Sequence, residues 1–241
     1  LKEEQDAFAA AAKIIDPKKS PIEVFKQVQQ DHPKPGELIA DVAKDLDQIR
    51  QYVLDHHLVT IPSDVRAQVM ETPSFDRATT FASMDTPGPF ETKATQAYYY
   101  ITPTESSWTE QQKNEWLTAF NYYTADVVSI HEAYPGHYVQ FLHLNASSAS
   151  KVEKVFGSYA FIEGWAHYTE KMMLDEGFGS VRNPTPEQTI RAAKYRLAQA
   201  DEALLRLCRL CVSIKLHTLG MPVEDAAKFF HENCYHEPKP S

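Results

Sequence analysis

Two short segments carry side chains that can bind a metal ion. HEAYPGH runs from His131 to His137, and EGWAH runs from Glu163 to His167. A hydrolytic zinc site takes three ligands from histidine and carboxylate side chains and leaves a fourth position for water, whose proton passes to a nearby carboxylate. We therefore expect one zinc ion, Zn2+, with His131, His137 and Glu163 as its ligands. Glu132, directly after the first histidine, is the expected general base.

The spacing of the two histidines departs from the usual zinc-binding pattern. In His-Glu-x-x-His the ligands lie one helical turn apart, whereas six positions separate His131 from His137. On an undistorted helix, six residues would place the two rings about 120° apart around the axis. Pro135 and Gly136 lie between them, and proline breaks helical bonding while glycine accepts conformations that other residues avoid. A bulge here is predicted to absorb the two extra residues and bring both rings to one ion.

A polar stripe on a second helix supports the same site. Glu163, His167 and Glu170 recur at i, i+4 and i+7, so they share one helix face. Apolar neighbours such as Phe161 and Trp165 indicate that this helix is well buried. A buried carboxylate is costly unless it is paired or bound to a cation. Glu163 is therefore the expected third ligand, and His167 or Glu170 is expected to orient a ligand.

Further side chains are candidates for contact with the substrate. The oxyanion of a hydrolytic reaction needs a hydrogen-bond donor, and the sequence does not choose between His217, His167 and Tyr134. The stretch 97–102, which contains Tyr99, has the aromatic and β-branched residues of a strand. In a zinc peptidase such a strand can pair its backbone with an extended substrate. An ordinary core strand is the alternative that we favour for its side chains.

The elements that must position these residues are mostly helices. Helical periodicity and capping signals predict helices over 1–15, 20–32, 35–55, 109–122, 124–144 with a break at Pro135, 158–176, 185–217 and 221–232. Between them, residues 58–103 are predicted to form a small β-element with irregular loops. The expected fold is mainly α, with N-terminal helices over 1–57 and a catalytic region over 58–241 in one continuous domain.

Composition excludes several classes of protein. Of the 241 residues, 43% are hydrophobic and 24% are charged, which is typical of a globular chain and not of a disordered one. The formal net charge of −9 argues against nucleic acid as the main partner, because phosphate binding needs a basic face. No run of about 18 uninterrupted apolar residues is present, so we expect no transmembrane segment.

The cysteines allow a second metal hypothesis. Cys208 and Cys211 share a helix face, and His231, Cys234 and His236 follow. A structural zinc site would normally place its cysteine pair in a tight turn rather than within a helix. Leucines surround the pair, and free cysteine behaves as a small buried hydrophobe. We therefore favour core packing for these cysteines over a second zinc ion.

The two motif segments also carry a resemblance to a known family. HEAYPGHYVQ followed by EGWAHYTEKM resembles the bacterial family called domain of unknown function 885. The later stretch 206–220, in which a Leu-His pair precedes a glycine, is similar to the family's next helix. The resemblance spans roughly residues 90–230. It implies a zinc-peptidase-like fold of the gluzincin type, with His131 and His137 as the paired histidines and Glu163 as the carboxylate ligand.

The resemblance implies further properties. Glu132 matches the general base of the family, and His217 matches a histidine near the expected site. Members are longer than this chain, so the sequence resembles a portion of a longer protein whose other parts pack on it. Members often carry export signals, which implies a location in the bacterial envelope or secretion.

We thus expect a zinc metallopeptidase that acts on a peptide or a small peptide-like substrate. The alternative from another class is a catalytically silent helical binding or scaffolding domain that keeps the metal site. Glu132 argues against that alternative, because a purely structural metal site needs no base. A metal-free esterase lacks support, since no Gly-x-Ser-x-Gly turn is present.

Overall fold

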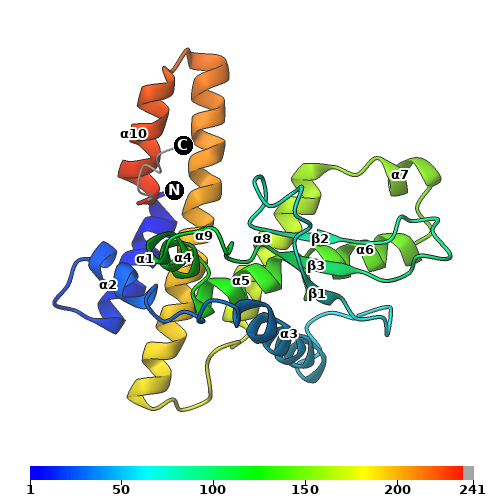
Figure 1. The fold of residues 1–241 in the computed structure, drawn as a ribbon, viewed down its shortest axis with the longest axis horizontal. Helices are drawn as coiled ribbons and strands as arrows, with labels where there is room; N and C mark the ends of the chain where they lie inside the picture. The colour runs from blue at the N-terminus through cyan, green and yellow to red at the C-terminus, as the bar shows by residue number, and fades with distance from the viewer. Residues whose placement is uncertain (236–241) are drawn as a thin grey trace. The chain divides into compact units, whose positions relative to one another are not determined.

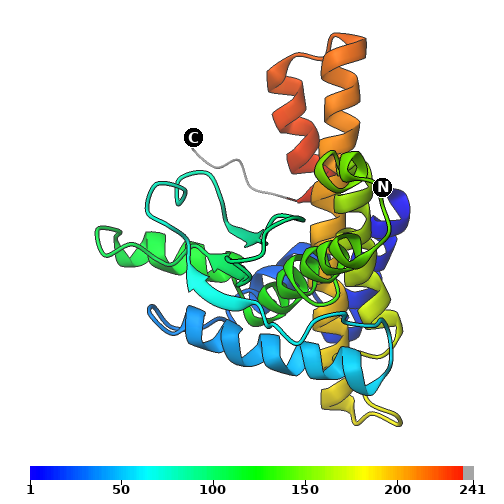
Figure 2. The ribbon, with the colours of Figure 1, turned by 90° about the vertical axis from the view of Figure 1, so that its right-hand side faces the viewer.

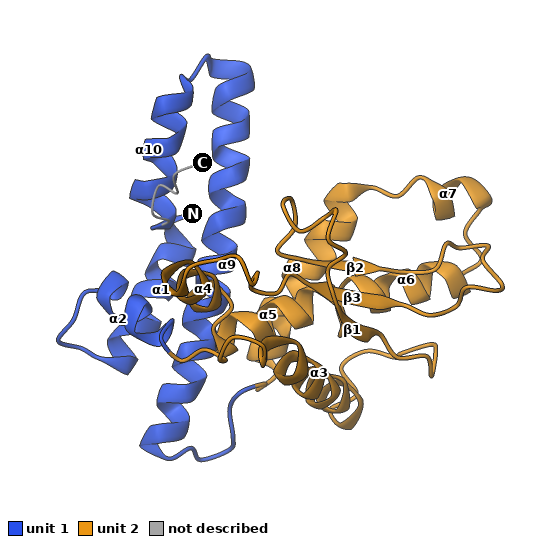
Figure 3. Ribbon diagram, viewed as in Figure 1, with its two compact units in different colours: residues 1–30, 179–241 blue, residues 31–178 orange. Residues whose placement is uncertain are grey.

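The chain is organised in two compact units. The computed structural model describes residues 1–235 and shows them as helices with one small sheet (Figure 1). Unit 1 comprises residues 1–30 and 179–241, and unit 2 comprises residues 31–178 (Figure 3). The predicted boundary lay between residues 57 and 58, and the observed division differs from it. The reason is packing: the first helix packs against the long helix that starts at Pro186, whereas the helix Leu38–Asp55 packs against elements that follow it.

Unit 1 is entirely helical in its described part. Its helices are α1 (Lys2–Ile15), α2 (Pro21–Val28), α9 (Pro186–Leu219) and α10 (Val223–Cys234). Ser20 and Glu23 form the capping box that starts α2, as their spacing predicted. α9 packs against both α1 and α10. It ends at Gly220, whose φ of 65° is left-handed and suits glycine.

Unit 2 combines a three-stranded sheet with helices. Its elements are α3 (Leu38–Asp55), β1 (Gln68–Glu71), β2 (Ala82–Asp85), β3 (Tyr98–Ile101), α4 (Glu110–Ala119), α5 (Tyr122–Glu132), α6 (His137–Ala146), α7 (Lys151–Val155) and α8 (Tyr159–Asp175). The predicted break in the helix over 124–144 is confirmed by the separation of α5 from α6. The short α7 was not predicted, although Ser150 and Glu153 form a capping box at its start.

The sheet has the order β1-β3-β2, so β3 is its central strand. β1 pairs with β3 in parallel and β2 pairs with it antiparallel. Over 98–101 both edges of β3 are therefore bonded, and the expected pairing of this strand with a substrate backbone is wrong. The core interpretation of its side chains is supported, because Tyr99 is 0% exposed and its hydroxyl lies 3.2 Å from the Ser129 hydroxyl.

The sheet is shorter than the predicted β-element. Residues 58–62 were expected to be extended but belong to no strand. The Thr60 carbonyl is instead bonded to the His143 ring at 2.8 Å, and Pro62 has no N–H to donate. The core of unit 2 lies where α3, α5 and the sheet meet; α3 runs beside β1 (Figure 2), and α5 packs against α3, β2 and α8. This packing fixes α5, whose last turn carries His131 and Glu132.

Candidate metal centre

α5 carries the first half of the candidate site. Asn121 caps it by accepting a hydrogen bond from the Thr124 N–H. α4 ends at Ala119, three residues before its predicted end, and α5 begins at Tyr122, two residues before its predicted start. Nearly every residue of α5 is buried, so the helix runs through the core of unit 2. Its last turn places His131 in the buried interior and Glu132 in a half-buried position.

The Pro-Gly segment between α5 and α6 forms a backbone elbow, residues 133–136. The Gly136 N–H donates to the Ile130 carbonyl at 3.0 Å, and the Val139 N–H donates to the Ala133 carbonyl at 3.4 Å. Each bond spans six residues where an α-helix spans four. The elbow thus absorbs two extra residues before α6 begins at His137. This confirms the predicted bulge at Pro135 and Gly136.

Only glycine fits at position 136. A Cβ atom there would lie 1.7 Å from the His131 carbonyl oxygen and 2.5 Å from the Ile130 carbonyl oxygen. Real Cβ atoms do not come this close to backbone oxygens, so any side chain would force the elbow open. The approach of Gly136 to His131 is what places the two histidine rings 4.7 Å apart, with an interplanar angle of 88°.

Three ligand atoms converge where α5, α6 and α8 meet. His131 Nε2 lies 3.5 Å from Glu163 Oε2, and His137 Nε2 lies 3.7 Å from Glu163 Oε1. The ligand atoms of the three residues all lie within 4.8 Å of one another. Ligands of a tetrahedral zinc ion at its usual bond lengths stand about 3.3 Å apart. The set of two imidazoles and one carboxylate therefore fits zinc in both chemistry and spacing.

Glu170 supports the first histidine from behind. Its carboxylate is fully buried, and Oε1 lies 2.7 Å from His131 Nδ1. Its other oxygen lies 3.2 Å from His167 Nδ1. A carboxylate that accepts the Nδ1 proton of a histidine leaves Nε2 with its lone pair available for a metal. Glu170 therefore contacts the candidate ligand His131 directly, whereas His167 contacts Glu170, and their role in orienting a ligand stays a prediction.

The burial of α8 differs from the prediction. The helix is buried along one stripe only, at Ala166, Thr169, Glu170 and Met173, where it packs against α5 and α6. Phe161 is 58% exposed, and the Glu163 side chain is 56% exposed. The carboxylate that is costly to bury is therefore that of Glu170 and not that of Glu163. The exposed Glu163 side chain lies on the side of the cluster that faces solvent.

Trp165 holds the elbow against α8. Its indole N–H donates to the Pro135 carbonyl at 3.0 Å. From the sequence, Trp165 is predicted only as an apolar neighbour of the polar stripe, although a partly buried indole N–H usually finds a partner. That signal pointed to a polar contact without saying where the acceptor lies.

Tyr134 of the elbow and Tyr138 of α6 are hydrogen-bonded to the segment before β1. The Tyr134 hydroxyl accepts a hydrogen bond from the Ala67 N–H at 3.0 Å, and the Tyr138 hydroxyl donates to the Val65 carbonyl at 2.8 Å. Burial raises the pKa of Tyr134, and it raises the pKa of Tyr138 to about 12. With 1% of its surface exposed, Tyr134 anchors the backbone. Its predicted role as an oxyanion donor is not supported.

The remaining candidates lie apart from this cluster or outside the described chain. His217 is an exposed residue of α9 in unit 1, so it is not among the residues that unit 2 brings together, and its catalytic role stays a prediction. Among residues 1–235, Cys208, Cys211 and Cys234 join no group that could hold a metal. His236 lies outside the described residues, and the structure gives no support to a second zinc site.

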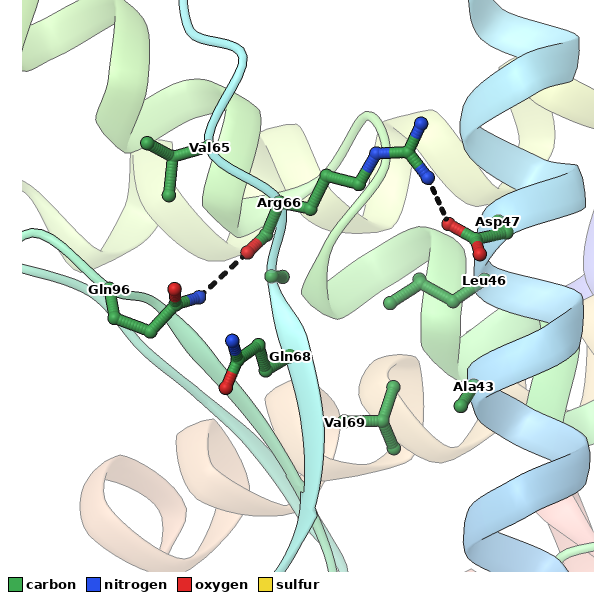
Figure 4. Close-up of a pocket in the computed structure, with 9 residues that line it drawn as sticks. Ala43, Leu46, Asp47, Val65, Arg66, Gln68, Val69 and Gln96 are labelled. Carbon is green, nitrogen blue, oxygen red and sulfur yellow. Dashed lines mark hydrogen bonds and ion pairs between the residues drawn. The ribbon is translucent and has the colours of Figure 1, made fainter.

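A separate cavity lies between α3 and β1 (Figure 4). Its volume is about 480 Å³. Arg66 forms an ion pair with Asp47 at 2.8 Å on one side, and the Gln96 amide donates to the Arg66 carbonyl at 2.8 Å. None of the three metal candidates lines this cavity. It is therefore distinct from the cluster around Glu163.

Replacing Gly136 with alanine should disrupt the elbow. We expect Gly136→Ala to lower the free energy of unfolding by about 3 kcal/mol, because the new methyl group overlaps two backbone carbonyls. Zinc affinity should fall with it, as the two rings separate. Gly164→Ala on α8 is the matched control, since a Cβ there meets nothing within 4 Å. Denaturant unfolding and zinc titration of both variants measure the difference; equal behaviour would contradict the proposed role of the elbow.

Glu170→Gln should weaken zinc binding while the fold is kept. The amide retains the shape of the side chain but loses the charge that supports His131, and the loss of such a partner typically lowers metal affinity about 10- to 100-fold. Chelator competition measures the affinity, and circular dichroism checks the fold. Glu176→Gln, at the exposed end of the same helix, serves as the control. Unchanged affinity in Glu170→Gln would show that the buried carboxylate has no part in metal binding.

Within residues 1–235, no helix has both the length and the apolar character that crossing a membrane requires.

Comparison with known proteins gives a family and a fold. A "putative lipoprotein of unknown function" from Shewanella oneidensis has a similar structure, with a TM-score of 0.79 and 26% identity over 98% of this chain. The "putative lipoprotein" from Colwellia psychrerythraea gives a TM-score of 0.76 and 16% identity over the same share. The chain spans only 42% and 38% of those two proteins.

No curated protein matches the chain. A family model described as "Bacterial protein of unknown function (DUF885)" matches residues 1–240. This match extends the resemblance of the motif segments to almost the whole sequence. The chain belongs to the DUF885 family.

Proposed function

We propose that this chain is the metal-binding part of a zinc-dependent hydrolase that cleaves peptide bonds. His131, His137 and Glu163 would hold one zinc ion. The observation that carries the proposal is the convergence of their ligand atoms within 4.8 Å from three helices. Zinc in hydrolytic sites is held by this kind of set, two imidazoles and one carboxylate, with a fourth position left for water.

The residues around the ligands supply what hydrolysis needs. A bound zinc ion would act as a Lewis acid and would lower the pKa of its water to about 7. Glu132 follows ligand His131 directly and is half-buried at the end of α5, so it is the nearest carboxylate in sequence that is not a ligand. It would accept the proton of the attacking water and return it to the leaving amine. Glu170 would keep His131 oriented throughout.

The open side of the cluster is where a substrate would enter. Glu163 faces solvent there, with 56% of its side chain exposed. The strand suited to pairing with an extended peptide is β2, because it lies at the edge of the sheet and packs against α5. An edge strand offers backbone donors and acceptors that a peptide can complete. We therefore assign peptide binding to β2 in place of the central β3.

A non-catalytic binding domain is the second candidate function. It would explain the metal ligands and the long α-helices without any reaction. Glu132 distinguishes the two, because a metal site with a structural role alone gains nothing from an adjacent carboxylate. The resemblance to proteins described as lipoproteins favours an envelope location for either function.

Removing the base should separate metal binding from catalysis. We expect the wild-type chain to contain one zinc ion and to cleave members of a peptide library. Glu132→Gln should keep the zinc and lose about 10²- to 10⁴-fold in activity, the usual contribution of a general base. His131→Ala should lose the zinc as well. Elemental analysis of the purified proteins and mass spectrometry of the digested library measure both quantities.

Glu224→Gln, at an exposed carboxylate in α10, is the control for this experiment and should behave as the wild type. A wild-type chain without stoichiometric zinc would overturn the proposed metal site. Zinc bound equally by the wild type and Glu132→Gln, with no cleavage by either, would favour the binding domain.

A further inference from the structure

Two of the three cysteines meet where α9 packs against α10. Cys208 lies in the second half of α9, and Cys234 is the last residue of α10. Both are 0% exposed and lie on helices that pack against each other, and Cys208 is near enough to Cys234 for a side-chain hydrogen bond to lower its pKa. The Cys234 thiol also donates to the Phe230 carbonyl of its own helix at 3.1 Å. Cys211, one turn after Cys208, is only half-buried. Unit 1 therefore holds one buried thiol pair and one separate thiol.

The thiol pair lies at a junction of three helices in unit 1. Next to Cys234, the Gln5 amide of α1 donates to the Asn233 carbonyl at 3.0 Å. On its other side, the Tyr235 ring lies 5.2 Å from the Phe8 ring of α1. The carboxyl end of α10 is thus held against α1 and α9 at one place. A covalent bond between Cys208 and Cys234 would join α9 to α10 at the place where α10 also contacts α1.

α10 packs against α9 but buries few of its side chains completely. Apart from Cys234, Ala226 is its one fully buried residue, and Val223 at its start is 71% exposed. Phe229 is half-buried, and the Lys215 ammonium of α9 lies 5.0 Å from the centre of its ring. Cys234 is therefore one of the two positions at which α10 is fully buried in unit 1.

We propose that Cys208 and Cys234 form a disulfide bond when the protein meets a disulfide oxidant. One thiolate attacks the oxidant's disulfide, which gives a mixed disulfide and releases one thiol of the oxidant. The second cysteine then attacks the mixed disulfide, which forms the Cys208–Cys234 bond and releases the second thiol. Two cysteine thiols are oxidised, and one disulfide of the oxidant is reduced to two thiols.

The surroundings of Cys208 and Cys234 favour disulfide formation over metal binding. Metal binding needs a third ligand, and within residues 1–235 no group of possible metal ligands includes a cysteine. Burial raises the pKa of the Cys208 thiol, which slows its attack in the folded chain. Oxidation is thus expected to be most efficient while the protein folds, before α10 closes over Cys208.

The bond would restrict the unfolded chain. Cys234 follows Cys208 by 26 positions (208 to 234), so the disulfide closes a loop that contains the end of α9, the turn at Gly220 and all of α10. Closing a loop of this length reduces the conformational freedom of the unfolded state. The oxidised protein should therefore melt at a temperature about 5–10 °C higher than the reduced one.

The test is refolding of the full chain in oxidised glutathione, followed by thiol counting in denaturant. The reduced protein has three thiols, and the oxidised protein should have one. Trypsin cuts after Arg209, which places Cys208 and Cys211 on different peptides. Mass spectrometry should find the Cys208 peptide linked to the Cys234 peptide, with Cys211 free.

Matched variants make the test decisive. Cys211→Ser should form the same link and show the same rise in melting temperature. Cys208→Ser and Cys234→Ser should show neither. Three free thiols after oxidative refolding, or a link that includes Cys211, would overturn the proposal and leave Cys208 and Cys234 as small core residues.

Discussion

The contact between Gly136 and the carbonyl of His131 is the constraint on which the rest of the site depends. Between α5 and α6 it allows backbone hydrogen bonds that span six residues instead of four, so that His137 at the start of α6 lies beside His131. Trp165 and Tyr134 hold this elbow from two sides by bonding to backbone groups. Because the constraint is a close approach of backbone atoms, glycine is required at 136, whereas the surrounding positions only have to keep it in place.

The second organising feature is the buried charge of Glu170. Burying a carboxylate costs several kcal/mol unless hydrogen bonds or a cation offset it. Here two imidazoles, those of His131 and His167, lie within hydrogen-bonding distance of the two carboxylate oxygens. The same interaction turns His131 Nε2 towards Glu163. The cost of burying Glu170 is thus tied to the orientation of a candidate metal ligand, and a partner of this kind would affect the affinity for a bound ion without touching it.

The sequence by itself determined the features that depend on local interactions. Capping boxes such as Ser20 with Glu23 marked the starts of helices, because side chain and backbone lie three residues apart in any fold. The candidate ligand set was predicted from residue type, since histidine and glutamate have donor atoms that zinc prefers. The Pro135-Gly136 bulge also followed, because its cause lies in the backbone of those two residues. These are the helical framework, the candidate ligands and the break between α5 and α6.

Only the tertiary structure decided which partners distant residues meet. The spacing of residues 97–102 predicted a strand, but its central place in the sheet results from pairing with β1 and β2, which no local pattern encodes. The stripe Glu163, His167, Glu170 predicted one helix face, yet the packing of α8 against α5 and α6 determined that Glu170 is buried and Glu163 exposed. Packing also determined that Tyr134 is buried and that its hydroxyl accepts a hydrogen bond from the Ala67 N–H. Local patterns fix conformation, whereas burial and partner choice depend on surfaces that meet only when the chain has folded.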